Sequence, residues 1–192
     1  RFVYPLFERI FKSADFIQTI SAYLAQFARD MGYRGELEIV PNGVNISHFS
    51  QQYKPEELFI LKQKLGKQPD DVFLITTSRL VKKNAVDEVI RALPLLDPNI
   101  KFLILGIGPD ETALRALADD LKVSNRVKFL RQVEHSDMPK YLRVADIFIR
   151  PSRSEGLGIS FLEAMAAELP VIATPVGGIP DFLFDPDKNG TN

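Results

Sequence analysis

Residues 145–163 read ADIFIRPSRSEGLGISFLE and hold the pattern that decides the fold. The apolar run at 147–149 has the composition of a buried strand. The glycines of Gly156-Leu157-Gly158 predict a tight turn, and a helical run that contains Glu163 follows it. A strand, a glycine turn and a helix in this order build an anion site in open parallel sheets, because free N–H groups and the positive dipole end point at the ligand. Glu155 and Glu163 flank the turn and suit a ligand that carries hydroxyls as well as a diphosphate.

Apolar runs alternate with amphipathic segments along the rest of the chain. We expect strands at 15–19, 37–40, 72–77, 102–105, 127–130, 147–149 and 171–174. We expect helices at 21–31 (capped by Ser21 and stopped by Gly32), 55–65, 86–96, 111–121 and 160–167, and one that Ser136 or Asp137 caps and that runs to 144. This alternation predicts an α/β protein with a Rossmann-like, three-layer parallel sheet. The stripe Val89, Leu93 and Leu96 is expected to lie in its core.

Four further blocks stand around that stretch, in a fixed order. They are VPNGVN at 40–45 with Phe49, SRLVKK at 78–83, LGIGP at 105–109 and VIATPVGGIPD at 171–181. Together the five blocks resemble the signature of retaining, nucleotide-sugar-dependent glycosyltransferases of the GT-B fold, family 4 (group 1 glycosyltransferases). The resemblance covers most of residues 39–181.

The resemblance also implies a domain organisation. Residues 1–36 would be the tail end of an N-terminal Rossmann-like domain, and residues 37–192 a C-terminal nucleotide-sugar-binding Rossmann-like domain that is incomplete at its C-terminus. The chain would then be the C-terminal half of a GT-B fold, truncated at both ends, with the acceptor half of the cleft missing. On its own we expect it to bind a donor better than it transfers sugar.

The residues themselves indicate where a diphosphate would bind. Arg79 directly follows the strand expected at 72–77, at the carboxyl end where open α/β sheets bind ligands. Cations and oriented amides would neutralise the charge that grows on a departing diphosphate. The resemblance implies that Arg79 and Lys83 hold the diphosphate, that Glu155 contacts the donor sugar and that Glu163 accepts bonds from the ribose hydroxyls. The remaining donor-binding residues that it implies are Gly156, Leu157, Gly158, Gly106, Gly108 and Val133, the last in a segment (131–133) that would approach the nucleobase through backbone groups.

The second cation departs from the family pattern. The family places its lysine just before a glycine, whereas this chain has Lys82-Lys83-Asn84-Ala85. Either Lys83 serves from a shifted loop, or Asn84 fills the lysine position and the second cation is weakened.

Composition excludes several classes of function. The net charge is −1 and no basic cluster with interleaved aromatics is present, so nucleic-acid binding is not expected. The absence of cysteine excludes a disulfide framework and a thiolate metal site, and fits a reducing compartment. No apolar run approaches the roughly 20 residues that span a bilayer. We expect a soluble, cytoplasmic protein and leave open a peripheral place at the inner membrane face.

Other possible sites have weaker patterns. His48 and His135 are far apart in the sequence and have no visible partners for a metal site or a catalytic triad. Gly106-Ile107-Gly108 lacks the third glycine of a dinucleotide fingerprint, because Glu111 stands there. The Asp-x-Asp at 185–187 is interpreted as turn chemistry.

The resemblance implies transfer of a hexose, with retention and without a metal or other cofactor, from a nucleoside-diphosphate sugar to a glycan, lipid or small-molecule acceptor. The alternative is a non-catalytic nucleotide-sugar-binding module. The sequence leaves open the base, the sugar, the acceptor, membrane association and the oligomeric state.

Overall fold

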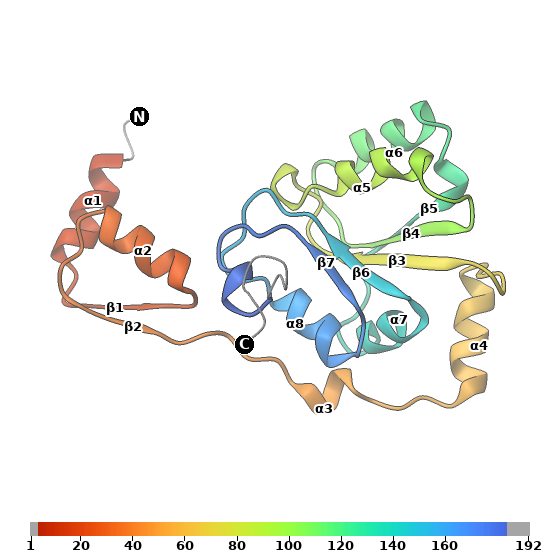
Figure 1. Cartoon of the computed structure of the whole chain (residues 1–192), viewed down its shortest axis with the longest axis horizontal. Helices are drawn as coiled ribbons and strands as arrows, with labels where there is room; N and C mark the ends of the chain where they lie inside the picture. Colours follow the sequence, from red (N-terminus) through yellow and green to blue (C-terminus); the bar gives the residue numbers. More distant parts are fainter. Residues whose placement is uncertain (1–3, 184–192) are drawn as a thin grey trace, which may run out of the picture. The chain divides into compact units, whose positions relative to one another are not determined.

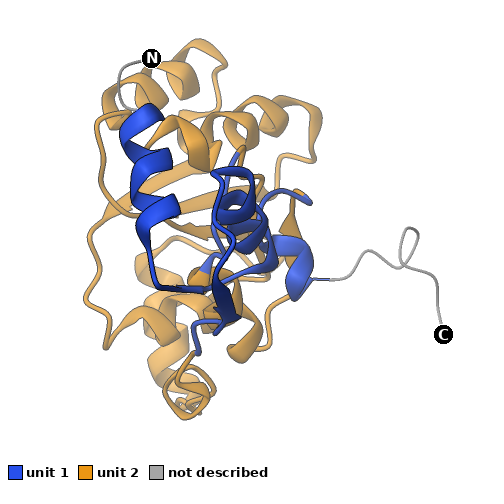
Figure 2. Cartoon of the chain, turned by 90° about the vertical axis from the view of Figure 1, so that its left-hand side faces the viewer, with its two compact units in different colours: residues 1–43, 154–158, 175–192 blue, residues 44–153, 159–174 orange. Residues whose placement is uncertain are grey.

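The computed structural model of the chain describes residues 4–183. They fall into two compact units, coloured separately in Figure 2. The first unit holds residues 1–43, 154–158 and 175–192, and the second unit holds residues 44–153 and 159–174. The division at Gly43 follows the Asn42-Gly43 pair.

The second unit is built on a five-stranded, all-parallel sheet (Figure 1). Its strands are β3 (Val72–Thr77), β4 (Ile100–Leu105), β5 (Val127–Arg131), β6 (Ile147–Arg150) and β7 (Val171–Ala173), in the spatial order β5-β4-β3-β6-β7. The chain runs outward from β3 to β5 and then returns to place β6 on the other side of β3. The carboxyl ends of β3 and β6 are therefore the topological switch point of the sheet, where open α/β sheets bind their ligands.

Helices cover both faces of this sheet. On one face lie α5 (Val86–Ala92) and α6 (Glu111–Asp120), and on the other lie α7 (Met138–Val144) and α8 (Ile159–Ala166) (Figure 1). The short α3 (Ile46–Phe49) contacts α7 and α8, and α4 (Pro55–Lys64) packs on α7. Three 3₁₀ turns, η1 (Lys82–Asn84), η2 (Leu93–Leu95) and η3 (Ser124–Arg126), complete the second unit.

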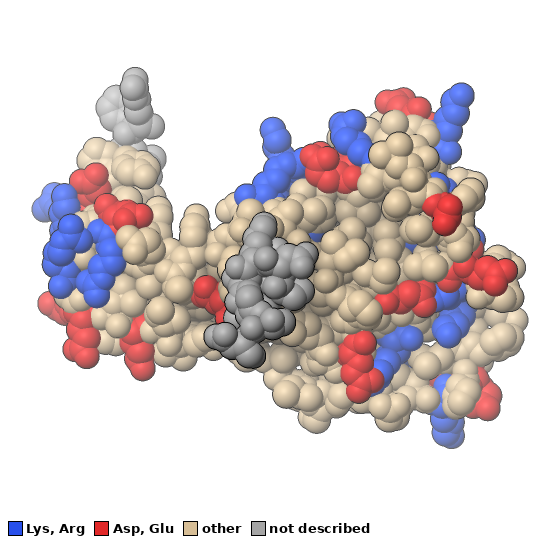
Figure 3. Space-filling view, viewed as in Figure 1, with Lys and Arg blue, Asp and Glu red and all other residues tan. Residues whose placement is uncertain are grey.

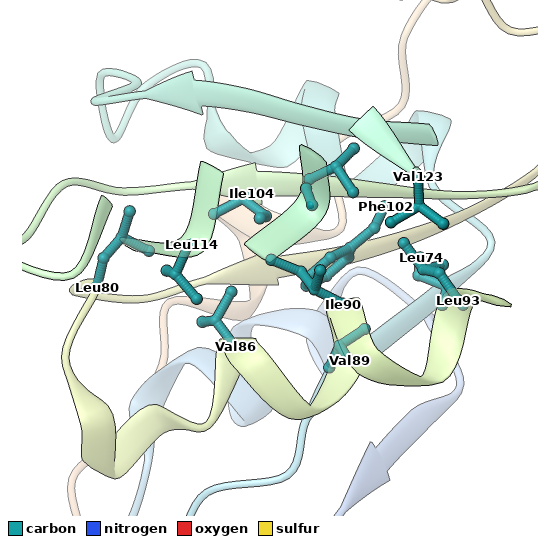
Figure 4. Packing of buried hydrophobic residues seen from close by; sticks show 12 residues of the cluster. Leu74, Leu80, Val86, Val89, Ile90, Leu93, Phe102, Ile104, Leu114 and Val123 are labelled. Atoms are coloured by element: carbon teal, nitrogen blue, oxygen red, sulfur yellow. The ribbon is translucent and has the colours of Figure 1, made fainter. Parts of the chain in front are cut away.

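The main core lies between the sheet and the α5–α6 layer (Figure 4). Strand side chains such as Phe102 and Ile104 meet Val89, Ile90 and Leu114 of the two helices there. Burying a side chain of this size contributes about 1.5–3 kcal/mol. Because β3 is buried along most of its length, the loop that follows it starts from a fixed point.

The first unit contains α1 (Tyr4–Ser13), β1 (Phe16–Thr19), α2 (Ala22–Asp30), β2 (Glu36–Ile39) and η4 (Ile179–Asp181). Its two strands pair in parallel. As predicted, the Ser21 hydroxyl caps α2, since it accepts a hydrogen bond from the Leu24 N–H at 3.2 Å. Gly32 follows α2 with φ +92°, a left-handed conformation that favours glycine.

The predicted strands and most of the predicted helices are confirmed within one or two residues, but four details differ. The helix expected at 86–96 ends at Ala92 and continues as η2, because Pro94 has no N–H to donate to the preceding turn. Leu96, predicted to be in the core, is 38% exposed, whereas Val89 and Leu93 are buried. Asp137 stands at the N-terminal cap of α7 without making a side-chain capping bond. The helices α1 and α3 were not predicted.

Two properties of the described residues bear on membrane binding and on surface charge. Among the described residues, every helix is too short or too polar to cross a bilayer. Acidic and basic side chains alternate over the face of the second unit that Figure 3 displays. The Asp-x-Asp segment at 185–187 lies outside the described residues.

Candidate functional site

A cavity of about 830 Å³ opens at the carboxyl ends of β3, β4 and β5 in the second unit. Its volume lies within the roughly 300–1,000 Å³ typical of small-molecule sites. The loops after these three strands line it together with the first turns of α8. Its polar lining residues are Thr77, Ser78, Arg79, Glu111, Arg131, Gln132, Ser160 and Glu163.

Two glycines allow the loops after β3 and β4 to pack against each other. A Cβ atom on Gly106 would stand 1.9 Å from the Ser78 carbonyl oxygen, and one on Gly108 would stand 2.2 Å from the Leu80 carbonyl oxygen. Gly106 also has φ +144°. The close approach lets the Leu80 N–H bond the Ile107 carbonyl at 3.0 Å. Both glycines line the cavity, and their absence of a side chain is a packing requirement.

Arg79 lies on a loop whose backbone is fixed on both sides. Leu80, the next residue, is fully buried in the core. The Asn84 side-chain amide donates a 2.7 Å hydrogen bond to the Arg79 carbonyl oxygen. The Arg79 guanidinium is exposed in the cavity lining, with no hydrogen bond or ion pair to any described residue. A cation held in this way is available to an anionic ligand.

The structure assigns different positions to the two candidates for the second cation. Asn84 is buried and closes η1, whereas Lys83 is exposed and is not part of the cavity lining. Ala85, directly after Asn84, adopts a left-handed conformation with φ +54°. Because left-handed positions favour glycine, Asn84 and Ala85 match the family's lysine and glycine positions better than Lys83 and Asn84 do. A role for Lys83 stays a prediction.

Arg153 supports this loop from the segment after β6. Its backbone N–H donates to the Lys83 carbonyl at 2.7 Å, and its guanidinium donates to the Lys82 carbonyl. The same guanidinium holds both oxygens of Asp87 at 2.9 and 2.8 Å and Glu88 at 2.7 Å. Hydrogen bonding to Arg153 lowers the pKa of Asp87, and the bond to Asp87 raises the pKa of Arg153. The pair therefore stays charged and fixes the loop that carries Arg79.

Glu163 of α8 lines the cavity with its side chain 17% exposed. Its Oε1 lies 3.7 Å from Nε2 of His135, and the His135 ring stacks on His48 with centroids 5.0 Å apart. His48 Nε2 is also 3.1 Å from the His135 carbonyl oxygen. The two histidines, far apart in the sequence, are therefore neighbours in the fold. The fold joins them because α3 packs against both α7 and α8.

The first turn of α8 is held by a buried arginine at the end of β6. Arg150, 6% exposed, donates a 2.7 Å hydrogen bond to the Ser160 hydroxyl and lies over the Phe161 ring at 4.3 Å. Ser160 and Glu163 both face the cavity. Arg150 thus fixes the end of α8 from which Glu163 reaches the site.

Arg131 closes the cavity at β5, the edge strand. Its φ is +59°, and its carbonyl oxygen accepts a 2.7 Å hydrogen bond from the Gly106 N–H. The register between β4 and β5 shifts at this point. Arg131, Gln132 and Val133 all line the cavity, so the segment expected near a nucleobase does lie at its wall.

The other predicted site residues belong to the first unit. Gly178 donates its N–H to the Glu155 carbonyl at 3.2 Å, and the Gly156 N–H bonds the Glu155 side chain at 3.0 Å. A Cβ atom on Gly177 would stand 1.7 Å from the Glu155 carbonyl oxygen. Leu157 is buried, and Gly158 has φ +91°. This strand-to-helix turn is tight, as predicted, and α8 begins at the next residue.

Five predicted residues thus share one cavity: Arg79, Gly106, Gly108, Val133 and Glu163. The sequence reasoning missed Ser160, His135 and the supporting role of Arg153. Only Ser160 had a usable signal, since it stands one helical turn before Glu163. Within residues 4–183, no group of three or more histidine, aspartate or glutamate side chains is arranged to hold a metal ion.

Comparison with known proteins assigns the family. A model of the family described as glycosyl transferases group 1 matches residues 59–191. The chain belongs to this family. A group 1 relative from Corynebacterium glutamicum, named a GDP-mannose-dependent monoacylated alpha-(1-6)-phosphatidylinositol monomannoside mannosyltransferase, is 38% identical over 186 residues. The match covers 91% of this chain and 48% of the relative. The alpha-monoglucosyldiacylglycerol synthase of Acholeplasma laidlawii is 32% identical over 160 residues, which is 81% of this chain and 40% of that protein.

Solved structures confirm the predicted fold class. The Anabaena protein HepE, in complex with UDP and glucose, superposes with a TM-score of 0.85 at 22% identity, over 94% of this chain and 50% of HepE. WaaG, a glycosyltransferase involved in lipopolysaccharide biosynthesis, superposes with a TM-score of 0.76 at 25% identity, over 86% and 45% of the two chains. The group 1 chain described here thus has the architecture of the C-terminal half of a GT-B fold. It spans about half the length of these relatives.

Proposed function

We propose that this chain is the donor-binding half of a retaining family 4 glycosyltransferase. The enzyme would transfer a hexose from a nucleoside-diphosphate sugar to an acceptor hydroxyl. The observation that carries the proposal is the cavity at the carboxyl ends of β3, β4 and β5, which has the free guanidinium of Arg79 near β3 and the carboxylate of Glu163 on α8. The guanidinium suits a diphosphate, and the carboxylate suits vicinal hydroxyls.

The chemistry assigned to Arg79 is charge neutralisation. When the bond between the sugar and the diphosphate breaks, negative charge grows on the departing oxygen, and the acceptor proton passes to that phosphate on the same face of the sugar. A guanidinium in a fixed loop stabilises this charge without reorganising. Lys83 would add a second cation from the same loop. We propose no metal and no other cofactor, since the cations and backbone amides take that role.

Glu163 would accept hydrogen bonds from the two ribose hydroxyls of the nucleotide. Its partly buried carboxylate, close to His135, has acceptor capacity left for both. Gly106 and Gly108 would let the nucleotide approach the backbone, and backbone groups around Val133 would contact the base.

Glu155 would contact the hexose of the donor, and the amides of Gly156, Leu157 and Gly158 would bind the phosphates. The support is local: the turn is tight, and its glycines precede the first residue of α8. Free N–H groups at such a position favour anions.

Two relatives suggest the class of acceptor. The names of the Corynebacterium and Acholeplasma proteins describe glycosylation of a phosphatidylinositol mannoside and of a diacylglycerol. We propose a lipid-linked acceptor, met at the inner membrane face by an otherwise cytoplasmic enzyme. Residues 1–36 would be the tail of the N-terminal, acceptor-binding domain and residues 37–192 the donor-binding domain.

Calorimetric titration of the chain with GDP, UDP and ADP, each with and without EDTA, tests the proposal. We expect at least one nucleotide to bind with an affinity that EDTA does not change. Arg79→Ala and Glu163→Ala should each weaken that binding at least about tenfold, in line with the loss of a charge-assisted contact. Arg91→Ala, which removes an exposed arginine of α5 outside this cavity, should leave it unchanged.

Failure of all three nucleotides to bind would overturn the donor-site assignment. Binding that EDTA abolishes would overturn only the proposal that no metal is needed.

A second candidate function is a non-catalytic nucleotide-sugar-binding module. The placement of Asn84 favours it, because the residue before the left-handed Ala85 is a buried amide and not a second cation. The whole protein distinguishes the two. Transfer or hydrolysis of a donor sugar that Glu155→Ala abolishes supports the enzyme, whereas donor binding without turnover supports the module.

A further inference from the structure

Among the residues that the structure describes, Arg131 is the only non-glycine residue of the cavity lining whose backbone adopts the left-handed conformation. For an L-residue this conformation costs about 1–2 kcal/mol, and glycine adopts it freely. Three other described residues share it: Ala85 precedes α5, and Lys122 and Glu168 follow α6 and α8 as helix-ending residues. Arg131 ends a strand, where no helix termination accounts for it.

The Arg131 side chain has no partner within residues 4–183. It is exposed, and no hydrogen bond, ion pair or ring contact joins its guanidinium to another described residue. Its backbone carbonyl is already used by Gly106. A glycine would make the same backbone bond at lower cost, so the side chain is the feature that remains to be explained.

The topology separates the backbone of Arg131 from that of Arg79. Arg79 follows β3, and Arg131 ends β5, two strands away in the order β5-β4-β3. Neighbouring strands lie about 4.8 Å apart, so the two strand ends are roughly 10 Å from each other. That separation is comparable to the distance between the diphosphate and the far edge of the base in a nucleotide. If Arg79 binds the diphosphate, the strand end that carries Arg131 is therefore at the right separation to meet the base.

A guanidinium reads one base edge best. It carries only donors, arranged as a planar fork. Guanine presents two neighbouring acceptors, O6 and N7, whereas adenine replaces one acceptor by the N6 amino donor. Uracil has no such pair of adjacent acceptors.

We propose that the Arg131 side chain binds the O6/N7 edge of guanine and makes the site selective for a guanosine diphosphate donor. The inference rests on the proposed donor site. It adds a base-specific side-chain contact to a segment otherwise expected to use backbone groups only.

The test compares Arg131→Gly with Lys122→Gly in calorimetric titrations of the chain with GDP, IDP, ADP and UDP. Both variants remove an exposed cation and relieve a left-handed residue, but Lys122 lies after α6 and outside the cavity. IDP keeps O6 and N7 and lacks only the guanine amino group, so it isolates the contact proposed. Thermal unfolding of each variant, expected at or above the unchanged chain's midpoint, shows that the fold is retained.

We expect the unchanged chain to bind GDP and IDP at least about tenfold more tightly than ADP and UDP. Arg131→Gly should lower the affinities for GDP and IDP at least about tenfold and leave the affinities for ADP and UDP within about twofold of those of the unchanged chain. Lys122→Gly should change none of the four nucleotide affinities.

Two results would overturn the inference while leaving the donor site intact: a GDP preference that survives Arg131→Gly, or equal weakening of all four nucleotides, which would place the arginine at the diphosphate. If no nucleotide binds, both the proposed donor site and this inference would be wrong.

Discussion

Two loops of the cavity wall each present an arginine, and they are built in opposite ways. In the loop at 78–85, the backbone around Arg79 is held by Asn84, by the buried Leu80 and by Arg153. In the loop at 131–137, the residues are mostly exposed and the Arg131 side chain makes no hydrogen bond or ion pair with another described residue. The first loop is preorganised for one chemistry that every nucleotide shares. Side chains of the second loop can be replaced with little loss of stability because they are exposed. Such a loop suits the discrimination of one nucleotide from another.

The largest effect should come from breaking the contact that fixes the first loop. Gly106→Ala would place a Cβ atom 1.9 Å from the Ser78 carbonyl on a residue with φ +144°. We expect it to lower the free energy of unfolding by about 3 kcal/mol or more, since backbone on both sides must shift. Urea unfolding measures this loss.

Gly43→Ala is the matched control. A Cβ atom there meets no atom within 4 Å, so the free energy of unfolding should change by less than about 1 kcal/mol. Equal effects of the two substitutions would show that the loop is not held by close packing.

An intermediate effect should follow from Arg153→Ala, which releases the Lys82 carbonyl and the carboxylates of Asp87 and Glu88 but keeps the backbone bond to the Lys83 carbonyl. The Arg153 and Asp87 side chains are 34% and 30% exposed, so solvent screening limits the loss of stability to about 1 kcal/mol at pH 7. Arg9→Ala, on the exposed surface of α1, is the control and should have almost no effect.

The same variant predicts a pH dependence. Hydrogen bonding to Arg153 lowers the pKa of Asp87 from its ordinary 3.8, so this contribution is fully present above that value. It is lost as the pH falls further, through the depressed pKa of the folded state. The stability difference between the unchanged chain and Arg153→Ala should therefore shrink below about pH 4. A difference that stays constant down to pH 2 would contradict the assignment of this ion pair.

The smallest effect belongs to the second loop. His135→Ala removes an exposed ring that stacks on His48, while the backbone carbonyl that His48 contacts remains. We expect the midpoint of thermal unfolding to stay within about 2 °C, equivalent to roughly 0.5 kcal/mol. A fall of many degrees would show that the two loops are equally rigid and would remove the contrast between them.

The sequence was sufficient for the sheet because its strands are short apolar runs. Val72–Thr77 was predicted to the residue, since buried parallel strands read as continuous hydrophobic segments. Arg79 could be placed near the site because it follows β3 at its carboxyl end, whereas Glu163, inside the helix after β6, was assigned to the same site by the family resemblance. The tight turn at Glu155 to Gly158 could likewise be predicted from its glycines.

Other features depend on distances that spacing does not encode. His48 and His135 are 87 residues apart and meet only because α3 packs against α7 and α8. The helix α1 has no buried residue, so no core position constrains its pattern. Asn84 and Lys83 could not be ranked from the sequence, because burial and the left-handed Ala85 separate them only in three dimensions.

The cap of α2 also constrains the order in which the chain folds. Besides Ser21, the carboxylate of Asp181 accepts a 2.7 Å hydrogen bond from the Ala22 N–H, across 159 residues of sequence. A chain that emerges from the ribosome N-terminus first therefore exposes α2 long before its second capping group has been synthesised. The five-stranded sheet, whose last strand ends at Ala173, can be complete before that bond forms. The helix α2 thus acquires its second capping bond only after the strands of the sheet have been made, and that bond closes a loop of 159 residues.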